Sequence, residues 1–230
     1  MGTIIKPLNI DASNIRAFFT TRIFNNNNEF IGAALSKEFD MPEDKIYLPV
    51  QKHTGNIHVL EGRFGPVVAD AVVTDRENIL IGILVADCVP VLLYDGGNKV
   101  IGAVHAGWRG TAKQILKNTI EMMINRFRCS PGNISVAIGP SIRQCSYEVA
   151  EDVKTEVQKA TGEGNYYRKQ GEKYYVDLSS ANRIQALTAG IPRENIWQSD
   201  ECTFCEPDKF YSYRFSKGTA GRQGGFIGMW

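Results

Sequence analysis

Apolar residues in the middle of the chain form short continuous runs. Three runs, over residues 79–86, 89–95 and 99–107, are rich in valine and isoleucine and are separated by turn residues such as Asp-Gly-Gly-Asn at 95–98. Runs of this length bounded by turn signals are typical of strands buried on both faces. We therefore predict three buried strands here, and a fourth over residues 133–140.

Helical spacing appears after the third run. Apolar residues at positions 116, 120, 123, 124 and 127 predict an amphipathic helix of about four turns. Valines at 149, 153 and 157 predict a second helix over 147–160, and a hairpin is expected around Gln170 and Gly171. A third helix is expected over 179–190, with Ser179 near its N-cap and Gly190 at its C-terminal end. Because strands and helices do not alternate regularly, we predict an α/β fold of the α+β type, with mixed sheets flanked by helices.

Composition narrows the class of protein. A chain of 230 residues that is 43% hydrophobic can bury a large core, and we expect one domain over 1–230. A formal net charge of +1 favours a small-molecule partner over nucleic acid or a membrane surface. With no secretory signal pattern and no run of about 18 apolar residues, we expect a cytoplasmic protein. The five cysteines are expected to be reduced, and the Cys202 and Cys205 pair lacks a second CxxC to complete a zinc site.

Three residues carry the candidate chemistry: His53 in PVQKHTG, Cys88 in VADCVPV and His105 in AVHAGWRG. Each lies at a predicted strand end or a turn beside one. Two imidazoles and a thiolate suit zinc, and three protein ligands leave a fourth position for water or substrate. The separations of 35 and 17 residues form no compact metal motif. Core or surface roles for these three residues therefore stay open from the sequence.

The same residues allow other functions. Cys88 and His105 could form a thiolate–imidazole pair in a cysteine hydrolase or deamidase. His53 distinguishes the two hypotheses, because a pair does not need it and a metal site does. A non-catalytic binding protein would leave all three as core residues, which the flanking glycines disfavour. His58 is expected to be an ordinary strand histidine.

Six segments, in order, resemble the YfiH-type family, once called laccase-domain or multicopper polyphenol oxidase-like proteins: QKHTG, ADAVVT, VADCVPVLL, AVHAGWRGT, IGPSIRQCSYEV and FYSYRFSKGTAGRQ. FFTTR at 18–22 resembles the family's N-terminal strand. The resemblance implies a layered α/β domain and a metal site on His53, Cys88 and His105. It also implies phosphorolysis of adenosine, inosine and methylthioadenosine, with adenosine deamination. The chain departs from the family where IFNNNN replaces a glycine-rich turn.

The number of histidines tests whether the chain can be a multicopper oxidase, as the older family name implies. A blue-copper centre alone takes two histidines and a cysteine, and a trinuclear cluster needs many more imidazoles than the three histidines available. We therefore exclude a four-copper oxidase. A single copper ion could still replace zinc, since copper binds most nitrogen and sulfur sites more tightly, so a single-copper polyphenol oxidase stays an alternative.

Nucleoside chemistry suggests further residues. Phosphorolysis requires a phosphate held beside the sugar, and Arg22 and Arg109 are the candidates because guanidinium binds phosphate in a bidentate fork. Deamination requires an activated water, which zinc supplies, and a proton shuttle, for which Asp70 and Asp87 are the candidates. Surface, helix-end and turn-capping roles are the alternatives for these four residues.

The segment HAGWRG yields further expectations. Trp108 is expected to pack rather than to stack on a base. Gly107 should leave room for substrate, so a valine there should obstruct the site and leave the metal bound. Replacing His105 by alanine should release the metal with little change in fold. Near the C-terminus, Arg222 is expected either to reach an anion or to close the sheet.

Overall fold

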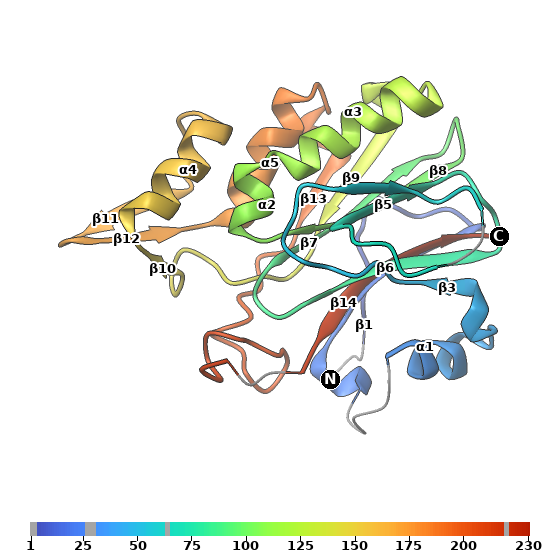
Figure 1. The fold of residues 1–230 in the computed structure, drawn as a ribbon, viewed down its shortest axis with the longest axis horizontal. Helices are drawn as coiled ribbons and strands as arrows, with labels where there is room; N and C mark the ends of the chain where they lie inside the picture. The colour runs from blue at the N-terminus through green and yellow to red at the C-terminus, as the bar shows by residue number, and fades with distance from the viewer. Residues whose placement is uncertain (1–3, 26–30, 63–64, 219–220) are drawn as a thin grey trace.

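The computed structural model describes residues 4–25, 31–62, 65–218 and 221–230 (Figure 1). The strands are β1 Ile4–Ile5, β2 Ile15–Thr20, β3 Ile46–Tyr47, β4 Ile57–Val59, β5 Ala71–Thr74, β6 Ile79–Val85, β7 Val89–Asp95, β8 Val100–Ala106, β9 Ile134–Ile138, β10 Glu148–Val149, β11 Tyr167–Gln170, β12 Lys173–Val176, β13 Ile196–Gln198 and β14 Gln223–Met229. The helices are α1 Ile31–Phe39, α2 Trp108–Ala112, α3 Ile115–Phe127, α4 Glu151–Thr161 and α5 Leu178–Thr188, with short 3-10 turns η1 Arg22–Asn25, η2 Glu43–Lys45, η3 Pro131–Asn133 and η4 Arg193–Asn195.

The strands form three sheets. One sheet has the order β13-β9-β7-β8-β5-β4, a second has the order β1-β2-β14-β6-β3, and a small third has the order β10-β12-β11. Helices α2, α3 and α5 cover the outer face of the first sheet, and α1 covers the outer face of the second (Figure 1). A separate apolar cluster fills the space between the two large sheets. The predicted mixed α/β fold is therefore confirmed.

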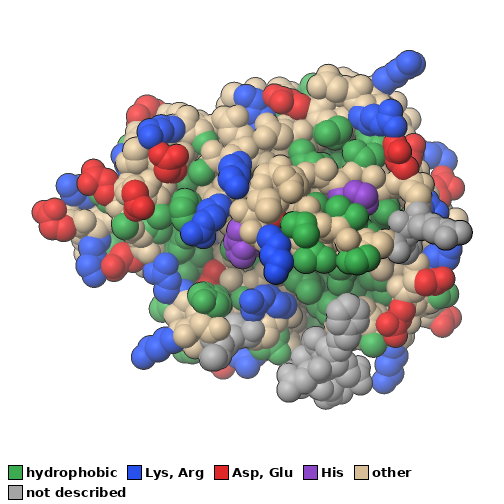
Figure 2. All heavy atoms as spheres, in the orientation of Figure 1, with side chains coloured by type: hydrophobic (Ala, Val, Ile, Leu, Met, Phe, Trp, Pro, Cys, Tyr) green, Lys and Arg blue, Asp and Glu red, His purple; other side chains and the backbone are tan. Residues whose placement is uncertain are grey.

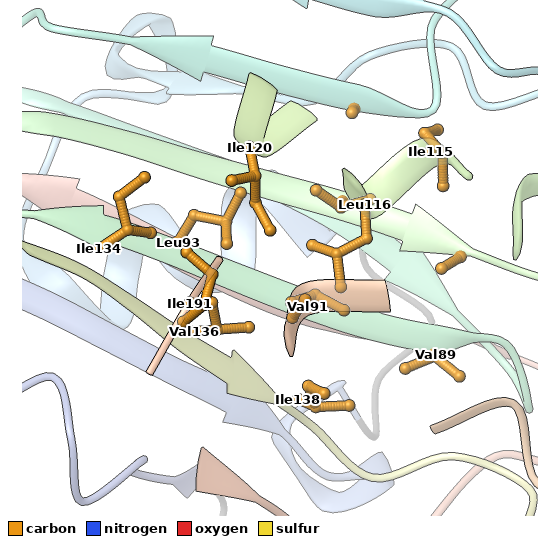
Figure 3. Packing of buried hydrophobic residues seen from close by; sticks show 14 of the residues in the cluster. Val89, Val91, Leu93, Ile115, Leu116, Ile120, Ile134, Val136, Ile138 and Ile191 are labelled. Atoms are coloured by element: carbon orange, nitrogen blue, oxygen red, sulfur yellow. The ribbon is translucent and has the colours of Figure 1, made fainter. Parts of the chain in front are cut away.

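The layers explain why the central strands read as continuous apolar runs. In β7, Val91 and Leu93 point toward Leu116 and Ile120 of α3, as Figure 3 shows. Leu92, between them, points to the opposite face and packs in the cluster between the sheets. Alternate residues of a strand point to opposite faces, so a strand buried on both sides has few polar positions.

Most predicted elements are confirmed, and the second helix is corrected. Residues 148 and 149 form β10, which pairs with β12, and α4 begins only at Glu151. Antiparallel pairing of Val149 with Tyr174 removes this valine from the helical pattern. The hairpin turns at Gly171 as predicted, with a φ of +60°.

The predicted third helix is confirmed as α5. Its N-cap is Asp177, whose carboxylate accepts a hydrogen bond from the Ser180 amide, so Ser179 lies in the first turn. Gly190 follows the helix with a φ of +89°, as its predicted C-terminal position requires.

Two further sequence expectations concern the IFNNNN segment and the membrane. The Asn26–Asn28 part of IFNNNN lies outside the described residues, so its effect on the substrate loop stays a prediction. None of the helices formed by the described residues has the length and apolar character needed to cross a bilayer.

Candidate active site

Strand pairing brings the predicted site residues together. β7 and β8 are antiparallel, with Pro90 opposite His105, and two further steps along this register place Cys88 opposite Gly107. β5 pairs with the other edge of β8, and its extended register places Asp70 opposite His105, whose amide donates to the Asp70 carbonyl over 2.7 Å. Opposed residues of antiparallel strands project to the same face of the sheet. The ends of three strands therefore place these side chains on the side facing the second sheet.

His53 is added by a loop that closes around Asp70. The Asp70 carboxylate is fully buried. Its Oδ1 lies 2.8 Å from His105 Nδ1 and accepts from the His53 amide at 3.0 Å. Its Oδ2 accepts from the Thr54 amide at 2.6 Å and the Thr54 hydroxyl at 2.7 Å. His53 has a φ of +56°, a left-handed conformation that histidine adopts more readily than most residues. One carboxylate therefore holds both histidines in place.

The three candidate metal ligands converge as predicted. The ligand atoms of His53, Cys88 and His105 all lie within 4.8 Å of one another, and His53 Nε2 is 3.9 Å from Cys88 Sγ. Because Asp70 takes Nδ1 of His105, Nε2 of that ring is left for a ligand. His105 is buried and His53 is exposed, so the set opens outward on one side. This donor set fits zinc or copper with an open coordination position.

The electrostatics favour a thiolate at the centre of the set. Burial by itself raises the pKa of the Cys88 thiol, but hydrogen bonds from His105 and His53 outweigh it and lower this pKa to about 6. Burial also disfavours charge on His105, yet its hydrogen bonds with Asp70 and Cys88 raise the His105 pKa to about 9. Without a metal, the pair is a thiolate beside an imidazolium at neutral pH. A thiolate is the form that both metal binding and nucleophilic catalysis require.

A cavity of about 630 Å³ opens over these ligands. Arg109, Arg214 and Arg222 line it together with Tyr147 and Trp108. Lys and Arg side chains gather beside a histidine near the middle of the molecular face in Figure 2. This combination of a possible metal position, cationic groups and aromatic rings suits a small anionic or aromatic ligand.

Arg109 and Trp108 act together at the edge of the cavity. The Arg109 guanidinium lies 4.4 Å from the Trp108 ring centroid. Trp108 also packs against the apolar cluster beneath the helices, which confirms the packing role expected of it. The stacked ring restricts the orientation of the exposed guanidinium, which stays available for an anion.

Asp87 lines the cavity but has both carboxylate oxygens occupied. It has a φ of +84°, its Oδ1 accepts from the Thr203 hydroxyl at 2.7 Å, and its Oδ2 accepts from the Arg214 amide at 2.7 Å. These contacts hold the C-terminal loop beside Cys88. Asp87 therefore positions the C-terminal loop, as Asp70 positions the two histidines. A proton-shuttle role for either residue stays a prediction.

Arg22 lies away from this set. Its guanidinium donates to the Pro207 carbonyl and lies 5.0 Å from the Tyr211 ring centroid. Among the described residues that line the cavity, Arg22 is absent. Its predicted phosphate contact therefore has no support from the geometry.

Sequence reasoning did not select Tyr147, and it matched Arg214 to the family's C-terminal signature without giving it a role. Arg214 donates to the Glu148 carbonyl at 2.9 Å and lies 5.2 Å from the Tyr147 ring centroid. Burial, together with the negative charge of Cys88, raises the pKa of Tyr147 to about 12. The Tyr147 hydroxyl therefore keeps its proton at neutral pH and can donate a hydrogen bond to a ligand. The available signals were the segments SYEV and FYSYR, which the family resemblance includes without assigning roles.

Gly107 corrects one expectation of the sequence. A Cβ at this position would lie 2.8 Å from Cys88 Sγ and 3.3 Å from His53 Cδ2. A side chain here strikes the ligands themselves, so it cannot leave the metal undisturbed. The backbone is not the obstacle, since φ is −69°.

We therefore expect Gly107→Ala to weaken metal binding by about tenfold or more, an effect in the range seen when ligand-orienting contacts are lost. Titration of the purified protein against a chromophoric chelator measures this affinity. Gly132→Ala is the matched control, because a Cβ there meets only Ser130 Oγ at 4.0 Å. Equal affinity in the Gly107 variant and the wild type would show that Cys88 and His53 can shift without loss.

Comparisons with known proteins identify the family and the fold of this chain. A family model described as multi-copper polyphenol oxidoreductase laccase matches residues 26–230. The chain is 36% identical to the protein named purine nucleoside phosphorylase YlmD of Geobacillus stearothermophilus, over 69% of this chain and 59% of that protein, which is less than two thirds of its length. It is 34% identical to adenosine deaminase RL5 from an unknown prokaryotic organism, over 78% of this chain and 73% of that protein. The crystal structure of the hypothetical protein YfiH of Bacillus licheniformis superposes with a TM-score of 0.87 at 28% identity, covering 94% and 93% of the two chains.

Proposed function

This chain belongs to the multi-copper polyphenol oxidoreductase laccase family, and from that premise we propose that it is a zinc-dependent enzyme acting on purine nucleosides. Its reactions would be phosphorolysis of adenosine, inosine and S-methyl-5'-thioadenosine, with deamination of adenosine beside them. Relatives named for purine nucleoside phosphorolysis and adenosine deamination support this choice. The observation that carries it is a single cavity that joins the His53, Cys88 and His105 set to three arginines.

The size and lining of the cavity suit a nucleoside. Its volume of about 630 Å³ lies inside the range of about 300–1,000 Å³ typical of small-molecule sites. Tyr147 contributes a ring against which a purine can pack, while Trp108 supports the Arg109 guanidinium beside it. The protonated Tyr147 hydroxyl is a donor for a ring nitrogen of the base, which must take up a proton as it leaves the sugar.

The arginines supply the site for phosphate. In phosphorolysis a phosphate oxygen forms a bond to the anomeric carbon while the bond to the purine nitrogen breaks, giving ribose 1-phosphate and the free base. The anomeric carbon becomes cation-like, so holding the anion at the correct distance and angle provides most of the catalysis. Arg109, Arg214 and Arg222 line the cavity. Asp87, the acid beside them, already accepts two hydrogen bonds from the protein.

His53, Cys88 and His105 would hold the metal. When bound, such an ion supplies Lewis-acid chemistry, because it lowers the pKa of water in its open position, as deamination requires. Asp70 keeps His105 in the tautomer that presents Nε2, and it fixes the loop that carries His53. Two histidines and a cysteine also bind copper, so the experiment must also identify the ion. An enzyme with four copper ions stays excluded by the count of three histidines.

Product analysis with and without phosphate tests the proposal. We expect inosine to yield hypoxanthine and ribose 1-phosphate only when phosphate is present, and adenosine to yield inosine in its absence. Arg109→Ala should raise the phosphate KM by about tenfold or more, since a hydrogen bond to a charged group contributes about 1.5–3 kcal/mol. Metal content should not change, and deamination should suffer less.

Arg193→Ala, at an exposed arginine of η4, is the matched control. Equal loss of both activities in the Arg109 variant would mean that this arginine binds the nucleoside rather than phosphate. Absence of any turnover of nucleosides, together with thiol-dependent cleavage of amides, would favour the cysteine hydrolase. The lowered pKa of Cys88 makes this the specific competing function.

A further inference from the structure

A second cluster of thiols lies outside the candidate active site. Cys145, in the segment between β9 and β10, has its Sγ 3.5 Å from the Sγ of Cys202 and 3.5 Å from that of Cys205. All three sulfurs lie within 4.8 Å of one another. The chain has no second CxxC, as the sequence shows, but the fold brings a third thiol beside Cys202 and Cys205 from 57 residues earlier in the chain.

We propose that Cys145, Cys202 and Cys205 bind a second, structural zinc ion. Thiolates bound to zinc at about 2.3 Å in a tetrahedron lie about 3.8 Å apart, which is close to the separations found here. A disulfide requires a sulfur separation of about 2.05 Å, and these sulfurs stand well beyond it. Three thiolates are soft ligands that select zinc over magnesium or calcium.

The backbone around the cluster supports thiolate ligands. The amides of Cys205 and Glu206 both donate to the Cys202 carbonyl over 3.1 Å, which folds the CxxC segment into a tight turn. The Arg143 amide lies 3.4 Å from Cys202 Sγ and donates to it. This contact favours a negatively charged sulfur, but burial outweighs it and raises the pKa of Cys202 to about 11, so a bound ion would displace a proton there. These interactions fix two of the three sulfurs before any ion binds.

Charge gives a second reason for a bound cation. The Arg143 guanidinium does not serve the sulfurs, because it donates to Asp177 at 3.0 Å and to the Ser199 carbonyl. A divalent ion would compensate the negative charge of the three sulfurs once they lose their protons on binding it. Cys145 and Cys205 are exposed, so water can complete a tetrahedron from the open side, where Ser146 Oγ lies 3.2 Å from Cys205 Sγ.

The position of the cluster indicates what the ion would do. Thr203, between the two cysteines of the turn, donates its hydroxyl to Asp87, next to Cys88. Tyr147, two residues after Cys145, lines the cavity. An ion on the three thiolates would join the segment that carries Tyr147 to the turn that holds Asp87. It would thus brace one wall of the active site without contacting substrate.

Metal analysis of full-length variants tests the inference. Protein purified under reducing conditions without added metal should contain about two zinc ions per chain, counting the candidate active site. Cys145→Ser and His53→Ala should each lose one, and the double variant should lose both. Cys129→Ala is the control, since Cys129 is buried and belongs to neither cluster. If Cys145→Ser fails to fold, Cys205→Ser, at another exposed thiol, replaces it.

Cobalt substitution identifies the ligands directly. The His53→Ala protein loaded with Co²⁺ should show sulfur-to-cobalt charge-transfer absorption, and adding Cys145→Ser should remove most of it. If the candidate active site binds no metal, wild type and His53→Ala should each contain one zinc ion, and Cys145→Ser should contain none. That result supports the thiol-cluster site even though the active-site metal proposal fails. Zinc content that Cys145→Ser does not change, or a disulfide among the three cysteines in unreduced peptide maps, would overturn it.

Discussion

Replacing His53 with alanine is expected to empty the candidate active-site metal position and to lower nucleoside turnover by more than about 100-fold. Loss of a contact that merely orients a ligand costs about 10–100-fold in affinity or activity, and loss of the ligand itself should exceed this. Stability should change little, because the side chain of His53 is exposed. Elemental analysis, inosine turnover and thermal unfolding measure the three effects.

Two variants accompany this experiment. Histidine and alanine both carry backbone strain of about 1–2 kcal/mol at a φ of +56°, and glycine relieves it, so His53→Gly removes the ligand without adding strain. His58→Ala is the matched histidine control, since His58 lies in β4 with its ring 5.5 Å from that of Tyr47, as its predicted strand role requires. A His53 variant that is free of metal and fully active would establish the Cys88 and His105 pair as the catalytic unit.

Asp70→Asn is expected to lower both stability and metal affinity. An amide cannot accept from all the donors that face this carboxylate, because its NH₂ group must point at either the Thr54 groups or the His105 and His53 groups. Each buried donor left without a partner costs about 1–3 kcal/mol, so we expect a loss of about 2–5 kcal/mol in the free energy of unfolding. Denaturant unfolding of metal-free protein measures it.

Metal affinity should fall by about 10–100-fold in the same variant, because His105 loses the group that orients its ring. Asp75→Asn, at an exposed carboxylate just beyond β5, is the control. Normal metal affinity and stability with a selective loss of deamination would restore the proton-shuttle role for Asp70.

The contacts of Asp70 also correct the expectation for His105. A residue at a strand end was expected to contribute few core contacts, so that alanine would change the fold little. His105 is only 4% exposed and its Nδ1 lies 2.8 Å from the buried Asp70. His105→Ala therefore leaves a buried carboxylate with one partner fewer, and both metal and stability should be lost. The exposed His53 is the cleaner test of the metal.

Local patterns in the sequence were sufficient to predict the central strands and helix α3. β6, β7, β8 and β9 are continuous apolar runs because both of their faces are covered, and α3 has one apolar face because only one of its sides packs. The start of α4 could not be read in this way. Val149 fits the helical spacing of its neighbours, but its pairing with Tyr174 in a distant strand decides its conformation.

The sequence by itself determined the types of side chain available to the site: two histidines and a cysteine at strand ends, with glycines beside them. Only the tertiary structure decided which side chains meet. The register of β5, β7 and β8 places Asp70 behind His105, and long-range packing brings Cys145 to Cys202 while it leaves Arg22 beside Pro207. Register follows from how the two sheets bury their opposing faces, which depends on residues far apart in the chain. The residue types in the sequence predict which ligands are available. Which of these ligands come into contact depends on how the sheets pack.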